Sequence, residues 1–198
     1  MKEIEVEVAF KNTKEEAIEI LSKFDYVGEK EIKDIYYYDP LRKNLKPESD
    51  LRLNETFRVR STKDKTFVTY KKQHFKGKLW IYSDEYETEV KDSKIIERIV
   101  SMLGLVPLIT VHNRRRIYRT EDYEIELEDV EGLGLFLEVE KLKQVKDDDE
   151  MSGKEEIRNF IRSLKLNNVR ELNIGKNQYL LSIAMKHPLK IFNDTDYN

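Results

Sequence analysis

The sequence predicts an α+β fold, namely an eight-stranded antiparallel sheet closed into a β-barrel with helices packed outside it. Strict alternation of charged and apolar residues marks the strands, glutamates share one face of several strands, and arginines share one face of others. A charged face cannot pack against a dry core. Closing the sheet solves this problem, because the charged side chains then line a hydrated lumen and the apolar ones face outward beneath the helices.

The N-terminal segment shows the alternation most clearly, since Glu3, Glu5 and Glu7 would lie side by side on one face of a strand. Such a row repels itself unless a cation lies among the carboxylates. The same parity recurs at Glu85 and Glu87 and in later segments. The predicted strands cover residues 2–10, 33–39, 55–61, 65–73, 79–90, 108–119, 122–129 and 134–141.

Helical spacing of apolar residues predicts the outer layer. A first helix, containing Ala17 and Leu21, has Asn12 and Thr13 as capping candidates. A second runs from Ile95 to Leu103, with Asp92 or Ser93 at its start and Gly104 just past its end. Two more are expected near 152–164 and 175–186. We expect residues 1–198 to form a single domain, with helices 152–186 packed on the barrel.

Composition excludes several classes of protein. The chain has 36 basic and 39 acidic residues, and this near balance argues against a nucleic-acid binder. There are no cysteines, which excludes thiolate metal sites and fits a cytoplasmic location. No apolar run reaches about eighteen residues, so we expect no membrane association. The oligomeric state stays open, a homodimer included.

Strands with basic side chains are expected to face the acidic strands across the lumen. Arg58 and Arg60 share one face of the strand 55–61, and Arg114, Arg115 and Arg116 lie together in the strand 108–119. Arginine grips phosphate oxygens in bidentate fashion, and glutamate holds Mg²⁺ or Mn²⁺ through hard oxygens. A ligand with many negative charges, bound with divalent cations, explains both. The alternative readings are a solvated sheet face for the glutamate rows and a nucleic-acid patch for the arginine triplet, although acidic flanks oppose the latter.

An ordered series of motifs extends these observations: Glu-x-Glu at 3–5, Phe-Arg-Val-Arg at 57–60, Thr-Tyr-Lys at 69–71, Glu-Tyr-Glu at 85–87, Arg-x-x-Tyr at 115–118 and Leu-Glu-Asp-Val-Glu-Gly-Leu-Gly-Leu-Phe-Leu-Glu-Val-Glu at 127–140. From about residue 3 to residue 185 the chain resembles the CYTH superfamily, which includes class IV adenylyl cyclases and thiamine triphosphatases among the triphosphate tunnel metalloenzymes. The resemblance implies an eight-stranded tunnel that binds a triphosphate (ATP, thiamine triphosphate or tripolyphosphate) with Mg²⁺ or Mn²⁺.

The same resemblance assigns roles to particular residues. It implies metal coordination by Glu3, Glu5, Glu138 and Glu140, and phosphate binding by Arg58, Arg60, Lys71, Arg114 and Arg115. Catalytic candidates are Lys71, Glu85, Glu87 and Glu128. Arg114 enters only as a substitute for a lysine of the family pattern. We expect these side chains, Arg114 apart, to point into one tunnel.

The chain departs from the family pattern at several positions. The signature lysine should fall at Glu7 or Ala9, and neither is a cation. Asn113 stands where a lysine is expected, Ser83 where an arginine often precedes the acidic pair, and Glu128 where aspartate is common. Each lost cation removes a charge-assisted phosphate contact.

The leading functional hypothesis is therefore a metal-dependent enzyme acting on a triphosphate. An adenylyl cyclase would form cyclic AMP and pyrophosphate, whereas a triphosphatase would direct water at a terminal phosphorus. The competing hypothesis is a noncatalytic module that binds triphosphate, polyphosphate or nucleotide. Metal-dependent binding is expected of both, so only turnover separates them.

Overall fold

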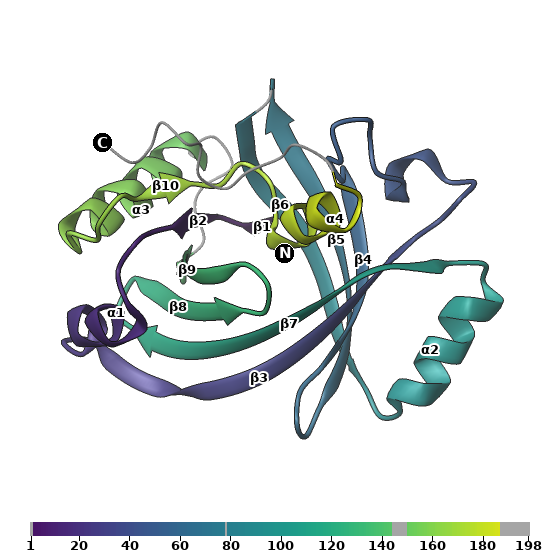
Figure 1. The fold of residues 1–198 in the computed structure, drawn as a ribbon, viewed down its shortest axis with the longest axis horizontal. Coiled ribbons are helices and arrows are strands. Elements are labelled where there is room, and N and C mark those ends of the chain that lie inside the picture. The colour runs from purple at the N-terminus through teal and green to yellow at the C-terminus, as the bar shows by residue number, and fades with distance from the viewer. Residues whose placement is uncertain (1, 78, 144–149, 187–198) are drawn as a thin grey trace.

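The fold is a strongly curled antiparallel sheet with helices on its outside (Figure 1). The computed structural model describes residues 2–77, 79–143 and 150–186. Neighbouring strands follow the order β1-β6-β5-β4-β3-β7-β8-β9-β2-β10. The strands are β1 (Lys2–Glu3), β2 (Glu5–Ala9), β3 (Asp25–Tyr38), β4 (Glu55–Ser61), β5 (Thr66–Lys76), β6 (Leu79–Val90), β7 (Val106–Arg119), β8 (Tyr123–Val130), β9 (Gly134–Lys141) and β10 (Arg170–Glu171).

The sheet does not close as completely as the sequence predicts. The N-terminal segment reaches both ends of the curl: β1 pairs with β6 through only two residues, and β2 pairs with β9 along its whole length. Between them the chain bends at Ile4, whose carbonyl accepts a hydrogen bond from the Lys141 amide at 3.1 Å. The α+β class and antiparallel pairing are confirmed, but where the sequence predicts an eight-stranded closed barrel, the described residues form an open curl of ten strands.

Most strand boundaries agree with the prediction. The expected ranges 55–61, 79–90 and 134–141 are those of β4, β6 and β9, and four others differ by a few residues. The exception is β3, which begins eight residues before the predicted start at 33. Its early part is exposed and charged, with a register shift beside Gly28, so it lacks the apolar alternation that identifies a half-buried strand.

The described residues form four α-helices, and the ends of α1 and α2 match the capping chemistry. Thr13 and Glu16 form a capping box at the start of α1, and Asp92 caps α2 by accepting a hydrogen bond from the Ile95 amide at 3.0 Å. Gly104 follows α2 with a φ of +85°. The helices are α1 (Lys14–Leu21), α2 (Ser93–Met102), α3 (Glu150–Ser163) and α4 (Lys176–Ala184), with a short 3₁₀ turn at Lys43–Leu45. In the described residues no helix combines the length and apolarity that crossing a membrane requires.

The main core lies between the convex face of the sheet and helices α1 and α3. Val6 and Val8, which alternate with the glutamates of β2, pack with Leu21 of α1 and with Ile157 and Ile161 of α3. Burying such side chains contributes about 1.5–3 kcal/mol each. The predicted outward orientation of the apolar residues is therefore confirmed here.

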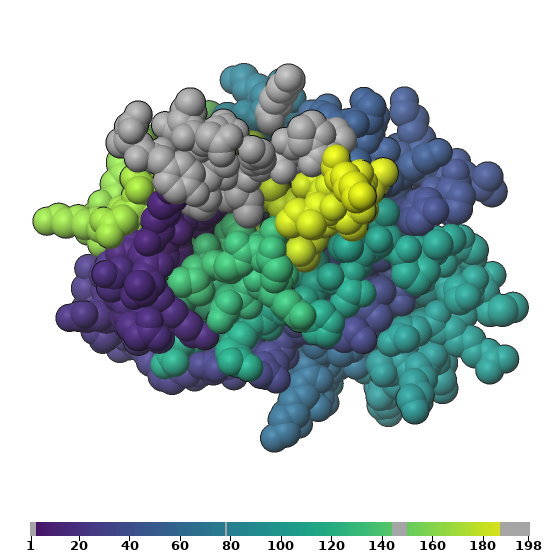
Figure 2. Space-filling model, viewed as in Figure 1, coloured from purple at the N-terminus to yellow at the C-terminus, as the bar shows by residue number. Residues whose placement is uncertain are grey.

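A second apolar cluster lies on the inner face of the sheet and closes one end of the interior. Ala9, Val130 and Phe136 continue the inward parity of the charged rows, and Tyr179 of α4 packs against them. In the space-filling view α4 lies directly against the strands of β8 and β9 (Figure 2). The inner face thus changes from charged to apolar along its length, and α4 sits at that boundary.

Candidate active site

The curl encloses a cavity of about 800 Å³ that is lined by ten carboxylates and five cationic side chains. The cations come from β4, β5, β7 and the start of α4. The lining includes ten predicted site residues: Glu3, Glu5, Arg58, Arg60, Lys71, Glu85, Glu87, Arg115, Glu138 and Glu140. Glu128 is on the same face of β8 as Glu126 but does not line the cavity, because it is fully buried in contact with Arg115 and Lys176. Residues distant in sequence are therefore brought together as strand parity predicts.

Asp34 of β3 organises the arginine wall. It lies opposite Arg60 in the β3–β4 register and accepts two hydrogen bonds from that guanidinium, each at 2.8 Å. Arg58 Nη1 lies 3.5 Å from the same carboxylate and 3.2 Å from the Tyr36 hydroxyl. Burial alone would raise the pKa of Asp34, but Arg58 and Arg60 outweigh it and hold that pKa well below its usual range. Both guanidiniums are therefore fixed before any ligand arrives.

Lys71 of β5 lies among carboxylates from two other strands. Its Nζ is 2.6 Å from Glu3 Oε2 and 2.9 Å from Glu85 Oε2. Burial alone would raise the pKa of Glu85, but the positive charges of Lys71 and Arg58 outweigh burial and lower that pKa to about 2. Glu87 accepts a hydrogen bond from the Thr69 hydroxyl at 2.7 Å and lies 3.8 Å from Arg58. The acidic pair on β6 therefore fixes the cations of β4 and β5.

Glu3, Glu5 and Glu140 form a group with more negative charge than its surroundings neutralise. Glu5 lies opposite Glu140 in the β2–β9 register. Burial, with the charges of neighbouring glutamates, raises the pKa of Glu3 to about 7 and that of Glu140 to about 8. Glu5 Oε2 is buried and has no hydrogen-bond partner within the described part of the chain. Hard carboxylate oxygens lacking a partner fit a divalent cation such as Mg²⁺ or Mn²⁺.

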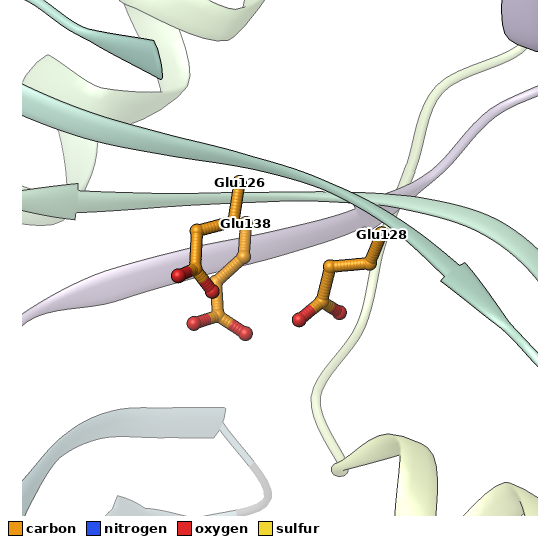
Figure 3. A group of neighbouring side chains, drawn as sticks. All are labelled: Glu126, Glu128 and Glu138. Atoms are coloured by element: carbon orange, nitrogen blue, oxygen red, sulfur yellow. The ribbon is translucent and has the colours of Figure 1, made fainter. Parts of the chain in front are cut away.

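Glu126, Glu128 and Glu138 form a second acidic group, in which carboxylate oxygens lie within 4.8 Å of one another (Figure 3). The protein's own cations enter this group. Arg115 Nε is 2.7 Å from Glu128, and the same guanidinium contacts Glu126. Lys176 Nζ is 2.9 Å from Glu138 and also contacts Glu128. These carboxylates are thus already paired.

The surroundings of Glu138 and Arg114 differ from those of the other predicted site residues. Burial would raise the pKa of Glu138, but Lys176, Arg115 and Lys71 hold it well below its usual range. Glu138 thus differs from Glu5, whose Oε2 lacks a hydrogen-bond partner among the described residues. Arg114 does not line the cavity. Its side chain is 50% exposed and lies 2.6 Å from Glu31 on the outer surface, because alternation along β7 turns it away from its neighbour Arg115.

Sequence reasoning missed Lys176, Asp34 and Tyr36 as cavity residues and gave no site role to Glu126. One signal for Lys176 was available. A lysine at the first position of a helix opposes the positive end of the helix dipole, so its placement there suggests partnered carboxylates. Nothing in the sequence names those partners, which lie on β2, β8 and β9.

The curled antiparallel sheet, its helices and its cavity of paired acidic and basic side chains define a tunnel-like α+β domain. Comparison with known proteins identifies the family to which this domain belongs. The model of the CYTH domain matches residues 1–173. The chain belongs to the CYTH domain family.

Related proteins agree with this assignment. "Putative adenylate cyclase MJ0240" of Methanocaldococcus jannaschii is 32% identical over 182 residues, covering 89% of this chain and 97% of that protein. The structure of PH1819 from Pyrococcus horikoshii has a TM-score of 0.76 at 26% identity, covering 93% of this chain and 99% of the other. A protein named putative adenylyl cyclase HpAC1, from Hippeastrum, is described as having a dominant triphosphatase activity; it shares the fold with a TM-score of 0.61 at 16% identity, covering 96% of this chain and 98% of the other.

The raised pKa values predict that the metal-free protein loses stability as pH rises from about 5 to 8. Burial raises the pKa of Glu7 to about 8, as it does for Glu140. A carboxyl whose pKa is higher in the folded state stabilises the fold at low pH, and that contribution is lost as pH rises through the folded value. Because a tenfold change in proton affinity corresponds to about 1.4 kcal/mol, we expect a total loss of a few kcal/mol. Urea unfolding in the presence of a chelator measures it.

Glu140→Gln is the matched variant for this experiment, because it should flatten the slope while Glu131→Gln, at an exposed turn, should not. The lowered pKa of Glu85 adds no slope in this interval, since its contribution is complete above about pH 4.5. Above pH 8 buried Lys154, whose pKa burial lowers to about 8, acts in the opposite sense. A stability that is flat or rising between pH 5 and 8 would contradict the charge arrangement.

Proposed function

We propose that this chain is a metal-dependent enzyme that binds and cleaves a triphosphate substrate inside the cavity. One observation carries the proposal: Arg58, Arg60, Lys71 and Arg115, held by carboxylates on neighbouring strands, face one enclosed space together with an excess of acidic groups. The family membership and the name of the M. jannaschii relative support it.

The excess of carboxylates makes a metal part of the proposal. With ten acidic and five cationic groups in its lining, the cavity as it stands would repel a polyanion. The acidic group of Glu3, Glu5 and Glu140, which Lys71 neutralises only in part, would hold Mg²⁺ or Mn²⁺. The cations of β4, β5 and β7 would contact phosphate oxygens. When bound, the metal supplies neutralisation of phosphate charge and polarisation of a phosphorus–oxygen bond.

The residues of the chain bind, orient and stabilise charge. Arg58 and Arg60, fixed by Asp34, present their remaining N–H groups to equatorial phosphate oxygens. Lys71 adds a point charge that Glu85 orients, and Glu87 steadies Arg58. Glu128 is completely buried and acts through Arg115 and Lys176, so it is a positioning residue and does not meet the substrate. Phosphoryl chemistry depends mostly on such positioning.

The same cavity serves two reactions. An adenylyl cyclase would align the ribose 3′-hydroxyl of ATP with the α-phosphorus, and a triphosphatase would align water with a terminal phosphorus. The purified protein should be incubated with ATP, thiamine triphosphate and tripolyphosphate in Mg²⁺ or Mn²⁺, and its products separated by chromatography. Cyclic AMP with pyrophosphate identifies a cyclase, and orthophosphate identifies a triphosphatase. Substrate that stays intact while raising the melting temperature would replace this proposal with a noncatalytic binding module.

Arg58→Ala should weaken the binding of tripolyphosphate by about 2 kcal/mol, or roughly thirtyfold, because a buried bidentate guanidinium is lost. Arg114→Ala is the matched control, since Arg114 lies on the outer surface and should change binding by less than about 0.5 kcal/mol. Isothermal titration calorimetry with Mn²⁺ present measures both. Equal affinities of the two variants would show that the phosphates bind elsewhere.

A further inference from the structure

Glu7 of β2 stands at one of the two positions, Glu7 or Ala9, where the resemblance predicts a lysine, and the ammonium of Lys176 lies beside it. Lys176 Nζ is 3.4 Å from Glu7 Oε1 and 2.9 Å from Glu138 Oε2, and it contacts Glu128 as well. Lys176 comes from the other end of the chain, at the start of α4. The carboxyl group of Glu7 on β2 and the ammonium of Lys176 on α4 are therefore neighbours.

The strands around Glu7 bring several acidic side chains together, so that a nearby positive charge stabilises them. Glu7 lies opposite Glu138 in the β2–β9 register, and Glu138 lies opposite Glu126 in the β8–β9 register. Three glutamates in one cross-strand row repel one another. Arg115 contacts Glu126 and Glu128, and Lys176 contacts Glu138, so these two cations offset the repulsion.

The backbone of Lys176 is held in place by contacts that do not involve its ammonium. Gln178 Nε2 donates to the Leu51 carbonyl at 3.0 Å, and Gln178 Oε1 accepts from the Gly175 amide at 2.7 Å. Tyr179 packs into the inner apolar cluster. These contacts fix the first turn of α4 over the cavity end. The lysine there opposes the helix dipole, which is tolerated because its partners are buried carboxylates.

We propose that Lys176 supplies from α4 the positive charge that the family pattern places on the first strand. It is a positioning residue: it pairs with Glu7, Glu128 and Glu138, and so shares with Arg115 the neutralisation of the acidic group beside the phosphate-binding cations. Lysine is one bond longer than glutamate, so a lysine at position 7 would carry its Nζ close to where the ammonium of Lys176 now lies. The inference rests on the proposed triphosphate function for its effect on binding, but its effect on stability is independent of that function.

Moving the charge tests the proposal. Three variants are compared with the parent: Lys176→Met, the double variant Lys176→Met/Glu7→Lys, and the double variant Lys176→Met/Glu7→Gln. Lys94→Met, on exposed α2, is the control. The melting temperature is measured with a chelator, and the affinity for tripolyphosphate is measured by calorimetry with Mn²⁺.

Lys176→Met should lower the melting temperature by about 6 °C or more, because buried carboxylates lose their partner. It should weaken tripolyphosphate binding about tenfold or more. With Glu7→Lys added, both quantities should return to near the parent values. With Glu7→Gln added, most of the melting temperature should return, but the affinity should stay low because no cation has been restored. Lys94→Met should change neither.

Two outcomes would overturn the proposal. The first is a Glu7→Lys double variant that melts no higher than Lys176→Met alone, because the charge would then not be transferable to the strand. The second is a Glu7→Gln double variant that binds tripolyphosphate as tightly as the parent. If Lys176→Met alone does not fold, the two double variants still decide, since they differ only at residue 7. Failure of the parent to bind tripolyphosphate would count against the proposed function, while the melting temperatures would still test the charge exchange.

Discussion

Arg115→Met should lower the free energy of unfolding by about 3–5 kcal/mol, which is the largest effect on stability that we expect from one substitution in the cavity. The Arg115 guanidinium is buried and contacts Glu126 and Glu128, with Glu138 at 4.0 Å. Methionine keeps much of the volume but removes the guanidinium that contacts Glu126, while Glu128 and Glu138 keep their contacts with Lys176. Urea denaturation in the presence of a chelator measures the loss.

Arg114→Met provides the control, because it removes the same chemical group from the adjacent residue. Arg114 pairs with Glu31 on the surface, where a salt bridge contributes about 0–1 kcal/mol. Lowering the pH toward 5 should recover part of the loss in Arg115→Met, since protonation removes the uncompensated charge. An Arg115→Met protein as stable as Arg114→Met at neutral pH would mean that the acidic group does not depend on the guanidinium.

The predictable part of the site depends on strand parity alone. Arg58 and Arg60 are two residues apart in β4, so one orientation places both in the cavity, and the same holds for Glu138 and Glu140 in β9. The alternation of side chains along one strand can be read from its own sequence, without knowing which strands lie beside it. This is why strand parity is enough to place these residues along the cavity wall.

Features that depend on pairing across the sheet could not be predicted in this way. The bidentate contact of Asp34 with Arg60 depends on the β3–β4 register, and a single aspartate in a tyrosine-rich strand gives no sign of it. Lys176 reaches the cavity only because α4 folds back over β7, β8 and β9. Arg114 is predicted as a substitute for the lysine expected at position 113, but neighbours in a strand face opposite sides, and its side chain lies on the outer surface.

The early part of β3 was missed for a different reason. Most of the residues between Asp25 and Lys33 are exposed, and the strand is held there by backbone pairing with β7, not by burial of alternate side chains. Hydrophobic alternation reports burial, so it cannot detect a strand that extends beyond the core. The opposite charges that face each other, such as Glu31 and Arg114, become informative only once the register is known.

Divalent metal should raise the melting temperature of the parent protein and should do so less in Glu5→Gln. If Glu3, Glu5 and Glu140 hold Mn²⁺, a concentration of 100 times Kd stabilises the fold by about 2.7 kcal/mol, or roughly 5–11 °C for a chain of this size. Without metal, Glu5→Gln should be at least as stable as the parent. The reason is that burial and the charge of Glu3 raise the pKa of Glu5, so its ionised form is unfavourable there.

Glu138→Gln separates a metal ligand from a carboxylate that is paired within the protein. Because Lys176 and Arg115 hold the pKa of Glu138 well below its usual range, removing this charge should destabilise the metal-free protein. The shift produced by Mn²⁺ should remain close to that of the parent. Differential scanning calorimetry with a chelator, and then with excess Mn²⁺, gives both quantities for each variant, with Glu131→Gln as the exposed control. A full metal-induced shift in Glu5→Gln, together with a diminished one in Glu138→Gln, would mean that the cation binds not at Glu3, Glu5 and Glu140 but at the acidic group that Arg115 and Lys176 contact.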